Sequence, residues 1–349
     1  MGRVLAPLKF FASEDFKMAD YILESTKDKR DRSADIEKML NDLGVCILGS
    51  GDFYVSGIKM PDRTTVKGMG AATRLILSEE VTEGAAITLG SFCTVREMHI
   101  LGAEEKIDIP EAVGARHGIL FAGNATEKHF SDPQPERGIV NSCFISSFSG
   151  GGITCDKTGY SPASSLTVSD CHIYRCGAAI NVSDFSEFHE FTNVNCMESR
   201  YGCINNGGNN VFVNCGFNCN VTAFLMDNSK GDKNNNSHGS VVGCTFNHSD
   251  KNNGIGIYIR NTRHGYVFTG CQLFFSKIII ENSTKLVFDS FNTGRNVDII
   301  IKGKHATDGG LITFNNFACN PAPKITIEDN DTVKFNNCFT NDGKQVIPQ

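Results

Sequence analysis

The segment Phe212-Val213-Asn214-Cys215 recurs in altered copies along most of the chain. Two later copies are Val241-Val242-Gly243-Cys244 and Phe268-Thr269-Gly270-Cys271, and the series ends at Phe335-Asn336-Asn337-Cys338. The aligned last position is Cys in most copies and Val or Phe in the others. It falls at residues 143, 171, 194, 215, 244, 271, 291, 317 and 338. The mean spacing of about 24 residues lies within the range of solenoid repeats.

A second apolar segment follows each copy, as in Ala179-Ile180-Asn181-Val182 and Ile278-Ile279-Ile280. β-branched residues and period-two alternation indicate strands with one buried face. A unit of this length cannot bury that face alone, whereas stacked units can. The pattern predicts an all-β chain: a single-stranded right-handed parallel β-helix of about 12 coils, with the aligned cysteines stacked in its core as apolar residues.

Asp or Asn usually ends the second segment of each unit. Both residue types tolerate the left-handed backbone conformation that a sharp corner needs. We therefore expect a ladder of turns at this corner. Its members are Asp156, Asp184, Asn206, Asp227, Asn261, Asn282 and Asp329.

Residues 32–44 read as an amphipathic helix with Ser33 as its N-cap and Gly44 at its end. Ile36, Leu40 and Leu43 form the apolar stripe. We expect this helix to cover the open end of the first coil, where unpaired strand edges would otherwise invite aggregation. The predicted division is an N-terminal docking or linker segment, 1–31, and a β-helix domain, 32–349.

Composition excludes several classes of protein. The net charge of −6 gives no reason to expect nucleic acid as a partner. No apolar run approaches the roughly 20 residues that a membrane span requires. The N-terminus lacks a secretory signal pattern, so we expect synthesis in a cytoplasm and fourteen cysteines without disulfides. No cysteine spacing matches a zinc site, and neither a metal nor a cofactor is expected.

The helix followed by GVCILGSGDFYVSGIKMPDRTTVKGMGAATRLIL, residues 44–77, resembles the opening of the pectate-lyase-like superfamily of right-handed β-helices. The later Phe-x-x-Cys coils extend the resemblance to about residue 340. Within the superfamily, the chain looks most like tail spikes and receptor-binding proteins of phages and prophages. That resemblance implies a bacterial cell-surface glycan as partner, docking to other tail proteins through the N-terminal segment, a homotrimer, and a final location in the virion tail. The calcium-binding acids of pectate lyases and the Asp pairs of polygalacturonases have no counterpart.

Carboxylates that follow successive second strands could serve glycoside hydrolysis, which needs two of them about 5–9 Å apart. Adjacent coils lie about 4.8 Å apart, so matching corners approach this spacing. Loops 183–190 and 226–239 carry the candidate catalytic residues. These are Asp184 or Glu187 as general acid, Asp227 as base or nucleophile, and His189 or His238 as hydrogen-bond partner. The alternative is that both loops are solvated corners.

Amides of the coil between these two loops are candidates for binding sugar hydroxyls, namely Asn205, Asn206, Asn209 and Asn210. Arg116 and His117 form a second candidate site, because Arg can bind a sugar carboxylate or phosphate in a bidentate manner. The alternative for this pair is a surface strand end.

Three functions remain open from the sequence. The first is a phage or prophage tail spike or receptor-binding protein that recognises a bacterial surface polysaccharide and either only binds it or also cleaves it. The second is a free-standing bacterial polysaccharide lyase, glycoside hydrolase or epimerase. The third is a structural fibre module without activity.

Overall fold

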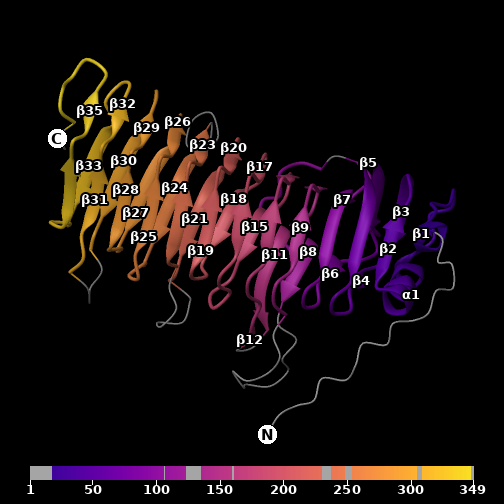
Figure 1. Cartoon of the computed structure of the whole chain (residues 1–349). Helices are drawn as coiled ribbons and strands as arrows, with labels where there is room; N and C mark the ends of the chain where they lie inside the picture. The colour runs from indigo at the N-terminus through magenta and orange to yellow at the C-terminus, as the bar shows by residue number, and fades with distance from the viewer. Residues whose placement is uncertain are drawn as a thin grey trace, which may run out of the picture.

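The chain winds into a right-handed parallel β-helix whose coils stack along one axis (Figure 1). The computed structural model describes residues 18–105, 107–122, 135–158, 161–229, 237–247, 254–304 and 309–346. Each complete coil contains a first, a middle and a last strand. First strands run from β2 to β34 in about twelve coils, which confirms the expected number.

Three rows of strands follow the axis, and every strand pairs in parallel with its counterparts in the neighbouring coils. The first strands are β2 (Val45–Leu48), the start of β5 (Thr65–Leu77), the start of β7 (Thr94–Leu101), β9 (Ile139–Asn141), β13 (Thr167–Ser169), β16 (Glu190–Thr192), β19 (Asn210–Val213), β22 (Gly239–Val242), β25 (Tyr266–Thr269), β28 (Leu286–Asp289), β31 (Ile312–Asn315) and β34 (Val333–Asn336). The middle strands are β3 (Gly51–Val55), the ends of β5 and β7, β10 (Phe144–Ser146), β14 (His172–Tyr174), β17 (Asn195–Met197), β20 (Gly216–Asn218), β23 (Thr245–Asn247), β26 (Gln272–Phe274), β29 (Asn292–Thr293), β32 (Ala318–Cys319) and β35 (Phe339–Thr340). The last strands are β4 (Ile58–Lys59), β6 (Gly84–Thr88), β8 (Arg116–Ala122), β11 (Gly151–Thr158), β15 (Ala178–Val182), β18 (Tyr201–Asn205), β21 (Thr222–Asp227), β24 (Ile255–Arg260), β27 (Lys277–Glu281), β30 (Asp298–Lys302) and β33 (Lys324–Glu328), with β12 (Ser161–Pro162) antiparallel to β11.

The core is built from identical positions stacked coil upon coil. All nine aligned positions are buried, from Cys143 to Cys338, as expected. Phe rings three residues before the aligned positions stack as well. The centroids of Phe268 and Phe288 lie 4.9 Å apart, and those of Phe314 and Phe335 lie 4.7 Å apart. Such in-register packing is possible because parallel pairing repeats the same position in each coil.

The sharp corner of each coil lies elsewhere than we expected. Of the seven Asp and Asn residues predicted to turn after the last strand, Asn261, Asn282 and Asp329 adopt a left-handed conformation. A complete ladder instead lies between first and middle strands, just before each aligned core position. Its members are Ser142, Asp170, Asn193, Asn214, Gly243, Gly270, Ser290, Asn316 and Asn337, with φ between 52° and 65°. The bend there is made by a single residue, which must therefore tolerate positive φ.

The middle strands were missed by the sequence interpretation. Each has at most three residues in most coils, with one buried side chain, such as Ile173 in β14 or Phe217 in β20. One buried residue is too little for an alternating pattern. The two flanking residues face outward, so this row forms an additional surface of the rod.

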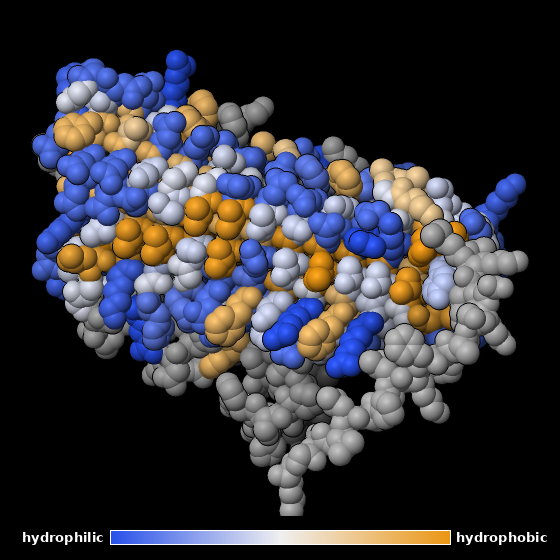
Figure 2. All heavy atoms as spheres, in the orientation of Figure 1, coloured by the Kyte–Doolittle hydropathy of each residue, from blue (hydrophilic) through white to orange (hydrophobic). Residues whose placement is uncertain are grey.

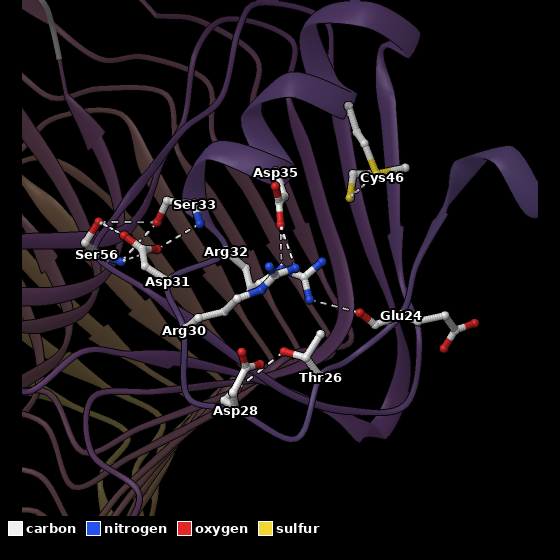
Figure 3. A network of polar contacts seen from close by, with 11 residues as sticks. Glu24, Thr26, Asp28, Arg30, Asp31, Arg32, Ser33, Asp35, Cys46 and Ser56 are labelled. Atoms are coloured by element: carbon white, nitrogen blue, oxygen red, sulfur yellow. Dashed lines mark hydrogen bonds and ion pairs between the residues drawn. The ribbon is translucent and has the colours of Figure 1, made fainter.

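Helix α1 (Ser33–Leu43) lies at the N-terminal end of the stack and contacts β2 and β4 (Figure 1). Ile36 and Leu40 are buried, and Gly44 ends the helix at φ 74°. Ser33 is the first helical residue and not the N-cap. Asp31 supplies the capping oxygen instead, because its Oδ1 accepts a hydrogen bond of 2.8 Å from the Ser33 N–H (Figure 3).

The edge of the first coil is paired by a strand that we did not expect. Strand β1 (Ile22–Leu23), which follows the 3₁₀ turn Met18–Tyr21, runs parallel to β2. Arg32 joins this segment to the helix: its Nη1 donates to the Glu24 carbonyl at 3.0 Å and its Nε donates to Asp35 at 2.7 Å (Figure 3). Of the predicted docking segment, residues 18–31 thus lie against the β-helix. Residues 1–17 lie outside the described residues.

All fourteen cysteines are free thiols, and every one except Cys219 is buried. Burial raises the pKa of Cys176 to about 12 and that of Cys271 to about 11, so both stay protonated at neutral pH. Their role in the structure is apolar packing.

Outward-facing residues are also in register and form rows along the rod. At the end of the last strands, Asp227, Arg260, Glu281, Lys302 and Glu328 follow one another with alternating charge. Apolar side chains also gather in a band along the rod (Figure 2). The same outward position of five last strands carries Ile204, Leu225, Tyr258, Ile279 and Ile300.

Candidate functional site

The loops predicted to carry function leave one corner of three successive coils. Loop 183–189 follows β15, loop 206–209 follows β18, and the segment after β21 leads to β22. Val182 pairs with Asn205, and Ile204 pairs with Leu225, so the three loops start side by side. Residues 230–236 of the predicted 226–239 loop lie outside the described residues.

Five residues at this corner form what we call the corner cluster: Asp184, Glu187, Phe188, Asn209 and His238. Glu187 Oε2 accepts a hydrogen bond of 3.1 Å from Asn209 Nδ2. The Phe188 N–H donates to the Gly208 carbonyl at 3.2 Å. The His238 ring lies over Gly208, where an added Cβ would come within 2.2 Å of its Cε1 atom. Asp184 is half-buried at the start of the same loop as Glu187.

Phe188 is the exposed aromatic residue of the cluster. Its side chain is 58% exposed, and its backbone is left-handed at φ 61°. Phe92 shares this conformation, but its ring lies 5.7 Å from the guanidinium groups of both Arg63 and Arg137. Within the described part of the chain, no ring or cation contact involves Phe188. The sequence interpretation did not single it out, although the register offered a signal: Phe191 fills the core position of this coil, which leaves Phe188 outside.

His189 lies in the core and closes the loop from within. Its Nδ1 accepts from the Leu166 N–H at 3.0 Å, and its Nε2 lies 2.8 Å from Ser186 Oγ, which donates to the Ala163 carbonyl. Complete burial lowers the pKa of His189 to about 3, so the ring is neutral. The expectation that it assists catalysis is therefore corrected to a structural role, because no substrate reaches it.

Two of the four predicted sugar-binding amides are buried in the same network. Asn210 Oδ1 accepts from the His189 N–H at 2.9 Å, and its Nδ2 donates to Asn205 Oδ1 at 2.9 Å. Asn205 in turn donates to the Tyr266 hydroxyl at 3.1 Å. Buried amides are costly unless they are paired in this way. Of the four, only Asn206 and Asn209 reach the surface.

Asp227 is held as an anion by its neighbours. Arg260 binds both carboxylate oxygens, with Nε 3.0 Å from Oδ1, and the Ser229 hydroxyl donates to Oδ1 at 2.6 Å. Partial burial alone would raise the pKa of Asp227, but the hydrogen bonds from Arg260 and Ser229 outweigh it, and the pKa lies below its usual value. A carboxylate bound bidentately is a poor base or nucleophile. Asp227 thus belongs to the charged row of the last strands.

Arg116 and His117 lie on β8, two coils before β15, and both fasten the backbone. Arg116 Nη2 donates to the Gly102 carbonyl at 2.8 Å and to the Ser78 carbonyl at 3.1 Å. His117 Nδ1 accepts from the Gly151 N–H at 2.8 Å. Burial lowers the pKa of both side chains. The pair does not present a cationic fork to a ligand.

The chain matches no family model and no curated protein. It is similar in structure to the A-module of mannuronan C-5 epimerase AlgE6 from Azotobacter vinelandii, with a TM-score of 0.63, 11% identity, and coverage of 92% of this chain and 96% of that one. It is also similar to a GH87 alpha-1,3-glucanase from Streptomyces thermodiastaticus, with a TM-score of 0.56, 12% identity, and coverage of 88% and 64%. A tailspike protein of Acinetobacter baumannii bacteriophage Fri1, described as a capsular polysaccharide depolymerase, matches with a TM-score of 0.52, 12% identity, and coverage of 91% and 64%.

Helices long and apolar enough to cross a membrane do not occur among the described residues.

The similarity to these solved structures lies in the course of the backbone. The parallel stacking of the strands agrees with the similarity to these structures over most of the chain. The chain therefore has the fold of a right-handed parallel β-helix.

Proposed function

We propose that the protein is a phage or prophage tail spike or receptor-binding protein that binds a bacterial surface polysaccharide at the corner cluster. The observation that carries the proposal is the exposed, left-handed Phe188 beside the Glu187–Asn209 pair. Three solved structures with the same fold act on polysaccharides according to their descriptions, which supports this class of ligand.

The conformation of Phe188 is unfavourable for folding alone. A left-handed backbone costs a residue with a Cβ roughly 1–2 kcal/mol. The exposed ring gains little from the hydrophobic effect. Unfavourable local features of this kind cluster at binding sites. A flat apolar ring stacks on the C–H face of a sugar, while the neighbouring carboxylate and amide accept and donate hydrogen bonds to its hydroxyls.

Cleavage of the bound polysaccharide is the second part of the proposal. Because Asp227 is bound to Arg260, the carboxylates for this reaction are Glu187 as general acid and Asp184 as its counterpart. Their separation would decide the stereochemical outcome, with about 5–5.5 Å for retention and about 6.5–9.5 Å for inversion.

The test is binding to an array of bacterial capsular and O-antigen polysaccharides. We expect Phe188→Ala to weaken binding to the recognised glycan about tenfold, and Glu187→Gln to weaken it or to stop the release of reducing ends. Phe275→Ala is the matched control, because Phe275 is also left-handed and is 39% exposed at a different corner. Parent-like binding by both cluster variants would place the site elsewhere. Binding to no glycan would contradict the function.

The assembly is proposed to be a homotrimer that joins the virion tail through its N-terminal segment. The half-buried apolar row from Ile204 to Ile300 supports an interface between copies, since such rows are more often covered than left in water. Light scattering should give about three times 38.0 kDa. A mass near 38.0 kDa at micromolar concentration would contradict the trimer.

A further inference from the structure

We infer that the protein has a second carbohydrate-binding site, a groove on the outer face of the middle strands that takes an extended, uncharged stretch of glycan. The class of ligand rests on the proposed function. The location does not, because the groove is built from different residues on a different row of strands from the corner cluster.

One register row forms the floor of the groove. One position in each of β7, β10, β14, β17, β20 and β23 pairs with the same position in the next coil. These positions face outward, because the residue that follows each of them, such as Ile145 or Ile173, points into the core. The row reads His99, Phe144, His172, Asn195, Gly216 and Thr245. Six coils at about 4.8 Å per step give a floor about 24 Å long, parallel to the rod axis.

Aromatic rings form the N-terminal end of this floor. The Phe144 ring stacks on that of His172, with centroids 5.0 Å apart and planes 9° apart, and meets His99 edge-on at 4.8 Å. Phe144 is 38% exposed. With Tyr174 and Met197, these rings line a hollow of about 360 Å³. An exposed aromatic surface of this kind suits the apolar face of a sugar ring.

Amides and a hydroxyl line the adjoining hollow of about 430 Å³. The two hollows share His172 and Asn195 in their linings, so they lie next to each other along the row. Gly216 opens the second hollow, because a Cβ at this position would lie 2.8 Å from Asn195 Oδ1. Among the described residues, no side-chain hydrogen bond holds the Asn195 amide, and its Oδ1 is buried without a partner. The amide can therefore turn toward a ligand hydroxyl without losing an existing bond.

Both carboxylates that line the groove already have hydrogen-bond or ion-pair partners. Asp170 accepts hydrogen bonds from Asn193 Nδ2 at 2.7 Å and from Asn141 Nδ2 at 3.3 Å. Glu198 pairs with Arg175 at 2.6 Å. Neither Lys nor Arg lines the two hollows in the described part of the chain. A polyanionic glycan would find no cation to neutralise it, so the groove fits uncharged sugars.

The same row supplies matched controls beyond the groove. Phe339 is 44% exposed on β35, and exposed Ala318 precedes it in the row on β32. Phe339→Ala is therefore the control for Phe144→Ala. Ala318→Gln is the control for Gly216→Gln, which fills the second hollow. None of the four is expected to change the melting temperature appreciably, because all four positions face outward.

The probe is the set of uncharged and polyanionic bacterial polysaccharides on the array, followed by calorimetry with oligosaccharides of the glycan that binds. We expect Phe144→Ala and Gly216→Gln each to weaken binding about tenfold. The affinities of the two controls should stay within about twofold of that of the parent. The His172 imidazole NMR signals of the parent should shift when the glycan binds. Parent-like affinity of both groove variants, with an unmoved His172 signal, would overturn the groove even if Phe188→Ala still weakens binding. Groove-dependent binding of polyanionic glycans alone would overturn the uncharged class. Failure of the parent to bind any glycan would remove the proposed function together with this inference.

Discussion

The corner cluster and the middle-strand groove are two surfaces of one rod, but their backbones are held in different ways. In the groove, every residue of the floor is fixed by parallel strand pairing and by a buried residue next to it, such as Ile173 beneath His172. At the corner, loop 183–189 leaves the strand ladder. Its backbone keeps a few backbone hydrogen bonds, such as that from the Phe188 N–H to the Gly208 carbonyl, and buried side chains supply the rest, chiefly Asn210, whose Oδ1 accepts from the His189 N–H.

This difference teaches how polar residues should be interpreted in a solenoid. Backbone groups that leave the ladder still need hydrogen-bond partners, and side chains must supply them when the loop packs against the core. The residues that do so are Asn, His and Ser, which are also the types expected to bind sugars. At the corner, a polar residue therefore indicates a structural role as often as a functional one. On the regular strands, an outward-facing polar or aromatic residue has no backbone groups to satisfy.

The largest expected effect concerns acid. Because the pKa of His189 is about 3 in the folded protein and 6.5 in the unfolded chain, its protonation favours unfolding. Its contribution to stability is complete above pH 6.5 and is lost as the pH falls, by about 1.4 kcal/mol per pH unit down to about pH 3. Urea unfolding of the parent and His189→Gln at pH 7, 6 and 5 should show a shallower loss for the variant.

His172→Gln is the control from the groove, since this histidine is exposed on the regular row. Its urea unfolding, measured at the same three pH values, shows what the removal of an exposed imidazole does. If the free energy of unfolding falls equally with pH in the parent and in His189→Gln, the corner does not depend on a neutral buried imidazole. The difference drawn between the corner cluster and the groove would then be wrong.

Two neighbouring amides offer a second comparison. Asn210→Ala should lower the free energy of unfolding by about 1–3 kcal/mol, because it leaves the His189 N–H and the Asn205 Oδ1 atom without the partner that Asn210 provides. Asn209→Gly removes an exposed amide at a left-handed position (φ 54°) that glycine also tolerates, and it should change stability by less than about 0.5 kcal/mol. Chemical denaturation measures both. Equal losses would mean that burial does not separate the structural amide from the surface one.

Among the variants expected to lose stability, the smallest loss is expected for Asp227→Asn. The side chain of Asp227 is 21% exposed, and the loss of its pairing with Arg260 should cost about 1 kcal/mol at pH 7. Since its pKa is depressed below 3.8 in the folded protein, this contribution is present above pH 3.8 and is lost as the pH falls further. The stability difference from the parent should therefore shrink below about pH 4. Unchanged stability at pH 7 together with lost glycan cleavage would restore Asp227 to a catalytic role.

Much of the fold was predictable because its signals repeat. The aligned core positions, the last strands and the helix before Gly44 all lie where the sequence places them. The middle strands were not predictable, since three residues around one buried side chain carry no period. The turn ladder was assigned to the wrong corner because Asn and Asp are frequent at both.

The candidate site was predictable only in outline. The sequence indicated which loops share a corner, and Glu187 and Asn209 do meet there. It could not separate Asn209 from Asn210, because these adjacent residues of one type differ only in which of them faces the core. Nor could it separate His238 from His189, because loop residues follow no period that tells buried from exposed positions.

The sequence by itself determined the solenoid, its approximate number of coils and the identity of its core, because each coil repeats the same local preferences and stacks only on its neighbours. Only the tertiary structure decided which polar side chains are buried in the loop network, that Asp227 meets Arg260, and that His99, Phe144 and His172 form one aromatic floor. The contacts Leu166–His189, Asp227–Arg260 and His99–Phe144 join residues 23 to 45 positions apart. They depend on loop lengths and on coil register, which no local pattern encodes.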